Sequence, residues 1–100
     1  MDAYDLVEIA RKKPAFYLPG GKSLRQLQAI VIGYEMGSGR GISSDFRPFN
    51  RWLAQRHGLP EASGWCNMVI TQAGSDEKAF DLFFELLDKF KSEARSRDAT

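Results

Sequence analysis

The carboxyl-terminal part of the chain carries the feature that most restricts its fold. Large apolar side chains recur there at three- and four-residue spacing: Phe80, Phe83, Phe84, Leu87 and Phe90. This spacing places them on one face of a helix, and so apolar a face has to be covered by other elements. We expect the helix to begin at Gly74 or Ser75, with Asp76 and Glu77 in its positively polarised first turn.

Two upstream segments show the same spacing. The first predicts a helix from Asp2 to about Lys12, with Asp2 as its cap and Pro14 ending it. The second begins at Ser23, where Gln26 three residues later completes a capping-box pattern. Its apolar positions are Leu24, Leu27, Val31 and Tyr34. Residues 37–41 contain three glycines, so this helix should end near Met36.

The middle of the chain predicts two further elements. Asp45 can cap a third helix in which Pro48 is the third residue and Gly58 marks the end. Residues 63–73 favour a helix capped by Ser63, although residues 68–71 also fit a short strand.

Together these patterns predict an all-α fold. The 100 residues suit one domain, a bundle of four to five helices with a short glycine-rich loop, in which residues 94–100 form a frayed tail. We expect Tyr17 and Leu18, in the connector 14–20, to pack against the second or last helix. The positions expected in the core are Leu27, Val31, Phe49, Leu53, Phe80, Phe83 and Leu87.

Composition argues against several classes of protein. No apolar run approaches the roughly 20 residues of a membrane span, and the amino end is acidic where a signal peptide would be basic. With one cysteine and one histidine, the chain forms no internal disulfide and lacks ligands for a structural zinc site. We therefore expect a cytoplasmic protein with no metal and no cofactor.

Catalytic motifs are weak. His57 and Cys66 are the one pair with nucleophile-and-base chemistry, but each position has a plain structural explanation, at a helix end and beside Trp65. Residues 20–23, Gly-Gly-Lys-Ser, resemble the end of a phosphate-binding loop but lack its first glycine, since Phe16 stands there. We expect no enzyme.

Charge is distributed unevenly along the chain. Residues 1–60 carry nine Lys/Arg and five Asp/Glu, a balance of +4, whereas residues 61–100 carry five and eight, a balance of −3. Four carboxylates at intervals of four, four and three follow one flank of the last helix: Glu77, Asp81, Glu85 and Asp88. We call them the acidic flank. Together with Arg40 on the glycine-rich loop, they are our candidate docking site for a protein partner.

Arginines alternate with aromatic rings in residues 46–56. The cations are Arg47, Arg51 and Arg56, and the rings are Phe46, Phe49 and Trp52. This composition suits nucleic-acid binding if the rings are exposed. Helical spacing instead places the rings in the core and leaves the arginines in water.

Several segments, taken together, resemble a family of small bacterial proteins. Residues 11–20, Arg-Lys-Lys-Pro-Ala-Phe-Tyr-Leu-Pro-Gly, are similar to its Pro-x-x-Tyr-Leu-Gly-like loop, and Ser-Leu-Arg-Gln-Leu at 23–27 leads to Ile-Gly-Tyr at 32–34. A Phe-x-x-Trp-Leu segment resembles residues 49–53, followed by a tryptophan like Trp65 and a last helix like residues 79–87. The resemblance covers about residues 8–90, mostly at core and turn positions.

This resemblance implies an immunity protein of a polymorphic or contact-dependent bacterial toxin system. Such a protein covers the active site of its cognate toxin and needs no catalytic residue of its own. The leading hypothesis is therefore a cytoplasmic immunity-type protein that neutralises a toxin by occlusion. The alternative is a small nucleic-acid-associated regulatory protein.

Overall fold

The structure is a computed structural model that describes residues 2–13, 18, 21–39 and 46–98, with side chains through Arg95. Five α-helices account for most of these residues: α1 (Ala3–Lys12), α3 (Leu24–Gly37), α4 (Arg47–His57), α5 (Trp65–Ala73) and α6 (Asp76–Asp98). A short 3-10 helix, η1 (Glu61–Ser63), precedes α5, and the described segments contain no strand. The predicted all-α fold is confirmed.

In the amino-terminal half of the chain, the helix caps are the residues that the sequence predicts. Asp2 caps α1 and exchanges hydrogen bonds of 3.0 Å with Asp5 in a capping box. The Ser23 hydroxyl caps α3 by accepting from the Gln26 amide at 3.2 Å. The last residue of α3 is Gly37, one beyond the predicted Met36.

Two predicted helix caps require correction. Phe46 rather than Asp45 occupies the cap position of α4, and Pro48 is its second residue; Asp45 itself lies outside the described residues. Gly64, at φ +86°, occupies the cap position of α5 in place of Ser63, which is the last residue of η1. The last helix is assigned to Asp98, and the fraying predicted for residues 94–100 stays a prediction.

One aromatic cluster fills the centre of the core. The Phe83 ring lies 5.0 Å from the Trp65 ring and 5.7 Å from the Phe49 ring, measured between centroids. All seven predicted core positions are buried. Leu18 is also fully buried, as predicted for the connector 14–20, whereas Tyr17 lies outside the described residues.

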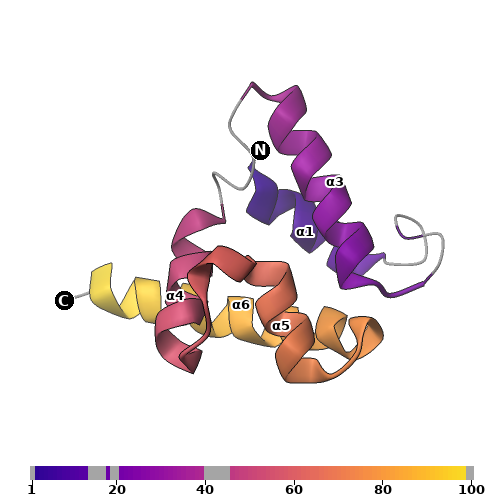
Figure 1. The fold of residues 1–100 in the computed structure, drawn as a ribbon. Coiled ribbons are helices and arrows are strands. Elements are labelled where there is room, and N and C mark those ends of the chain that lie inside the picture. The colour runs from indigo at the N-terminus through magenta and orange to yellow at the C-terminus, as the bar shows by residue number, and fades with distance from the viewer. Residues whose placement is uncertain (1, 14–17, 19–20, 40–45, 99–100) are drawn as a thin grey trace.

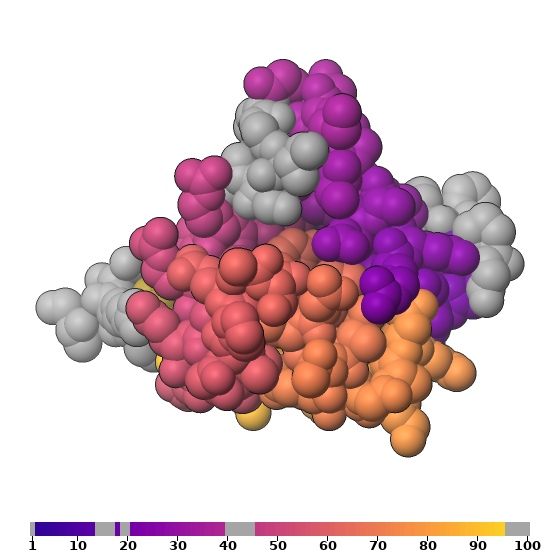
Figure 2. Space-filling model, viewed as in Figure 1, coloured from indigo at the N-terminus to yellow at the C-terminus, as the bar shows by residue number. Residues whose placement is uncertain are grey.

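Helix α6 is the central element of this arrangement. It contacts α3, α4 and α5, while α1 packs mainly on α3 (Figure 1). In the space-filling view α4 and α5 lie in front, the orange amino-terminal part of α6 is visible beside them, and its yellow carboxyl-terminal half shows only at the margins (Figure 2). The apolar face that the sequence places on this helix is thus the face that the other helices cover.

A polar contact joins the amino-terminal ends of α3 and α6. The Asp76 carboxylate accepts a hydrogen bond of 2.5 Å from the Ser23 hydroxyl and one of 3.0 Å from the Arg25 amide. Partial burial by itself raises the pKa of Asp76, but the hydrogen bonds from Ser23 and from the Arg25 and Leu24 amides bring that pKa below its ordinary value. Asp76 therefore acts as a second cap for α3, supplied by another helix.

None of the helices, within the residues described, is both long and apolar enough to cross a membrane.

Candidate functional site

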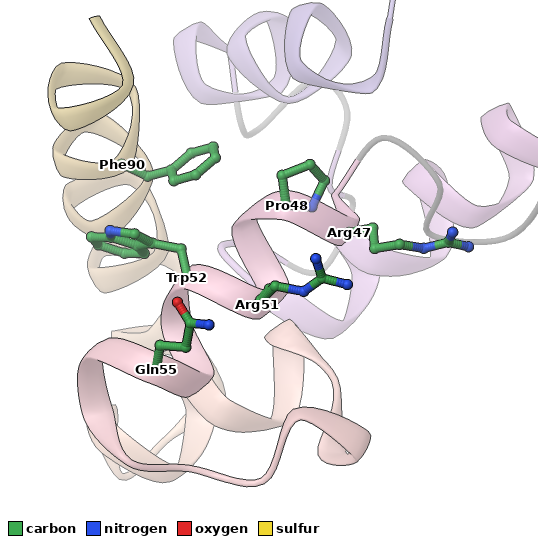
Figure 3. Close-up of a pocket in the computed structure, with 6 residues that line it drawn as sticks. All are labelled: Arg47, Pro48, Arg51, Trp52, Gln55 and Phe90. Atoms are coloured by element: carbon green, nitrogen blue, oxygen red, sulfur yellow. The ribbon is translucent and has the colours of Figure 1, made fainter. Parts of the chain in front are cut away.

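The outer face of α4 borders a hollow of about 300 Å³ (Figure 3). Arg47, Arg51 and Gln55 lie at intervals of four along this face and are exposed. The other lining residues are Pro48, Trp52 and Phe90. The hollow lies between α4 and the carboxyl-terminal half of α6, and we call it the α4–α6 groove.

The floor of the groove is apolar. The Trp52 and Phe90 ring centroids lie 5.6 Å apart, and both rings pack against the buried Phe49 ring at 6.0 and 5.5 Å. Trp52 is 9% exposed and Phe90 is half-buried, so the floor is formed by the outer edge of the core. It is therefore fixed in position by the packing that holds the fold together.

A charge cluster lies at the Gln55 end of the groove, where Trp52, Gln55, Arg56 and Glu93 line a further hollow of about 190 Å³. The Arg56 guanidinium donates two hydrogen bonds, of 3.1 and 2.8 Å, to the two carboxylate oxygens of Glu93. The Trp52 indole donates to the same carboxylate at 3.4 Å, and the Arg56 guanidinium lies 5.6 Å from the Trp52 ring centroid. This cluster ties α4 to α6.

At the other end, Pro48 and Phe90 also line a second hollow of about 450 Å³. It extends over α6 to Lys91, Ala94 and Arg95 and reaches the start of α1 at Asp2 and Tyr4. The two hollows are neighbours, with Pro48 and Phe90 in the lining of both.

Positive charge surrounds the open part of the groove. The Arg51 guanidinium lies 3.6 Å from the Glu61 carboxylate, with both side chains more than half exposed, which makes a weak ion pair. In the described part of the chain, Arg47 and Arg95 form no ion pair. The groove thus combines one arginine that is unpaired within the described residues, Arg47, and one weakly paired arginine, Arg51, with an apolar floor.

The acidic flank is exposed along α6 as predicted, but two of its four carboxylates face cations from other helices. Asp88 accepts hydrogen bonds of 3.2 and 3.0 Å from the Arg11 guanidinium, and this contact raises the pKa of Arg11. Asp81 accepts one of 3.2 Å from Lys22. Glu77 and Glu85 have no such partner among the described residues, and Arg40 lies outside them.

The two residues with nucleophile-and-base chemistry have different surroundings. Cys66 is fully buried in α5, and burial raises the pKa of its thiol to about 11. The charged groups that act on it are Arg25 and Asp76. His57 is exposed at the end of α4, beside the Trp52 ring. Within the described residues, no cluster of three or more His, Cys, Asp or Glu side chains is arranged to hold a metal ion.

The arginine-aromatic segment divides as its spacing predicts. Phe46, Phe49 and Trp52 face the core, and the arginines face solvent. Sequence reasoning did not find Pro48, Phe90 and Arg95 as parts of a site. The four-residue spacing of Arg47, Arg51 and Gln55 is the one sequence pattern that indicates an exposed face at this site. No pattern in the sequence indicates which part of α6 lies beside that face.

Comparison with protein-family models, curated proteins and solved structures found no significant match to this chain.

Proposed function

We propose that this chain is a cytoplasmic immunity-type protein, which binds a bacterial toxin domain and neutralises it by occlusion. The observation that supports a binding role is the α4–α6 groove, a charged depression with an apolar floor on a well-packed helical scaffold. Rings and guanidinium groups of this kind are the side chains that dominate the affinity of protein interfaces. The resemblance described above makes a toxin domain the first partner to test.

The chemistry of the groove suits binding better than catalysis. Its six lining residues, two arginines, a proline, a tryptophan, a glutamine and a phenylalanine, include no nucleophile and no general base with a suitable pKa. Because occlusion needs only a complementary surface, such a lining is sufficient for an inhibitor.

The alternative function is a small nucleic-acid-associated regulator. Exposed Arg47 and Arg51 favour phosphate contacts. However, base stacking requires accessible rings, and those of Phe46 and Phe49 are fully buried. Salt-dependent phosphate contact would then be the main source of affinity, so a steep salt dependence of RNA or DNA binding would support this alternative.

Co-expression tests the proposed function. The first observation to make is the genomic neighbourhood: an adjacent reading frame for a large secreted protein with a variable carboxyl-terminal domain would supply the toxin domain for the assay. We expect co-expression of this chain to restore growth of cells that produce the domain, and the two purified proteins to co-elute in size-exclusion chromatography. A toxin domain that keeps its full activity in the presence of excess chain would refute the proposal.

The acidic flank and the groove are two alternative docking surfaces for the toxin, and variants in that assay distinguish them. The double variant Asp81→Lys/Glu85→Lys tests the flank. If the flank steers the toxin, this variant should associate more slowly and with a weaker salt dependence. Equal protection of cells and unchanged association kinetics would remove the flank from the proposal.

A further inference from the structure

The Arg56–Glu93 cluster shows how this surface holds a carboxylate. Two guanidinium hydrogen bonds meet the two oxygens in the bidentate geometry that gives arginine–carboxylate pairs their strength. The Trp52 indole adds a third donor from the floor of the groove. One carboxylate of the chain itself is thus held beside the Trp52 ring at this end of the groove.

Arg47 and Arg51 present the same donors further along α4. Arg47 has no ion pair among the described residues, and Arg51 has only the exposed pair with Glu61 at 3.6 Å. The hollow that they line also contains Trp52 and Phe90, so charged donors border an apolar floor. In Figure 3 both guanidinium groups extend to the same side of α4, away from the two rings. Four residues of helix place the two arginines about 6 Å apart along the axis.

We propose that the α4–α6 groove binds an acidic amphipathic helical segment of a partner protein. Two carboxylates one helical turn apart on that segment pair with Arg47 and Arg51. An aliphatic or aromatic side chain between them enters the hollow over Trp52 and Phe90. The assignment rests on the proposed function only for the identity of the partner.

Geometry and charge both favour this occupant. Carboxylates four residues apart on a helix have the same axial spacing as the arginines. The carboxylate that meets Arg51 replaces its weak, exposed ion pair with Glu61. A hollow of about 300 Å³ with an apolar floor accepts a large apolar side chain, which a mononucleotide phosphate or a free anion does not provide. Arg95 adds a further cation in the neighbouring hollow, which shares Pro48 and Phe90 with the groove.

Titration with a synthetic peptide, followed by amide chemical shifts of the full chain, tests this proposal. The probe is a capped peptide with glutamates at positions i and i+4 and leucines at positions that lie next to them on the same side of the helix. Its control is a scrambled peptide of identical composition. We expect shift changes at Arg47, Arg51, Gln55, Phe90 and Arg95, and affinity that falls as salt is raised. The scrambled peptide should bind at least about tenfold more weakly.

Charge reversal supplies the matched variants. Arg47→Glu/Arg51→Glu should weaken peptide binding about tenfold or more, because two charge pairs become repulsive. The variant should fold, since Arg51 is 63% exposed and a glutamate at position 47 suits the positive first turn of α4. Lys13→Glu/Lys78→Glu makes the same change in net charge, from +1 to −3, at exposed positions outside the groove, and should change affinity less than about twofold.

Three results would overturn the proposal: shift changes located outside the groove, equal binding of the scrambled peptide, or tighter binding of oligouridylate at the same amides. The outcomes for the groove and for the proposed function are separable. If the chain neutralises the toxin but the peptide does not bind at the groove, the immunity function stands and the groove assignment fails. If the peptide binds the groove but the chain neutralises no toxin, the groove assignment stands and the immunity function fails.

Discussion

Replacing Asp76 tests whether one carboxylate joins the starts of two helices. In the structure it accepts hydrogen bonds from the Ser23 hydroxyl and the Arg25 amide, both from the α3 terminus. Asp76→Ala removes the acceptor, and Asp76→Asn keeps its shape and one acceptor oxygen without the charge. Glu77→Ala, at the next, exposed position, is the matched control, because within the described residues Glu77 forms no side-chain hydrogen bond or ion pair with α3.

The expected magnitude follows from these contacts. Loss of a helix cap costs about 0.5–2 kcal/mol, and a hydrogen bond to a charged group contributes about 1.5–3 kcal/mol. Because Asp76 remains partly exposed and water replaces some of the lost contacts, we expect Asp76→Ala to cost about 2 kcal/mol. At about 4–8 °C per kcal/mol for a chain of this size, Tm should fall by about 8–16 °C. Glu77→Ala should cost less than about 1 kcal/mol.

The pH dependence separates charge from shape. The pKa of Asp76 is lower in the folded protein than the value of about 3.9 in an unfolded chain, so protonation of this carboxyl favours unfolding. Its stabilisation is complete above about pH 5 and is lost as pH falls through the folded-state pKa. The difference in unfolding free energy between the wild type and Asp76→Asn should therefore shrink as pH falls from 7 to 3.

Urea denaturation followed by circular dichroism, at several pH values, measures these differences. The contributions of the other carboxylates largely cancel in the comparison, since the wild type and Asp76→Asn share them. An equal difference at pH 7 and pH 3, or a cost below about 0.5 kcal/mol for Asp76→Ala, would refute the assignment of Asp76 as a cap shared between α3 and α6.

Three further predictions concern the core, the thiol and the surface. Phe83→Ala should cost about 3–5 kcal/mol in urea denaturation, because the ring is fully buried among other rings; a cost below about 1 kcal/mol would contradict its central position. Cys66 should react very slowly with a disulfide reagent at pH 8, where a pKa of about 11 leaves about one thiol in a thousand ionised, and rapidly in denaturant; fast reaction of the native protein would contradict its burial. Asp81→Lys/Glu85→Lys should leave helix content unchanged and shift stability by less than about 1 kcal/mol, because the lost Asp81–Lys22 ion pair is exposed; a larger shift in Tm than about 8 °C would show that the flank is structural.

The sequence by itself determined which residues form helices and which faces they bury. Apolar spacing in 80–90 predicted the buried face of α6, and Asp2 and Ser23 predicted the caps of α1 and α3, because these signals act within one or two turns of the chain. Where two local signals competed, as in residues 63–73, the sequence left helix and strand open. In the structure this segment forms helix α5, which packs against α6, α4 and α3.

Only the tertiary structure decided which surfaces meet. The sequence identified Asp76 as a residue of the first turn of α6, but its role as a cap for α3 depends on how the two helices pack. It likewise predicted a continuous acidic flank, whereas Arg11 and Lys22 pair with two of its carboxylates. The groove exists because Phe90 lies beside Trp52. Helical periodicity is a local property and carries no information on which distant helix covers a given face, so long-range packing alone sets the charge and shape of the surface.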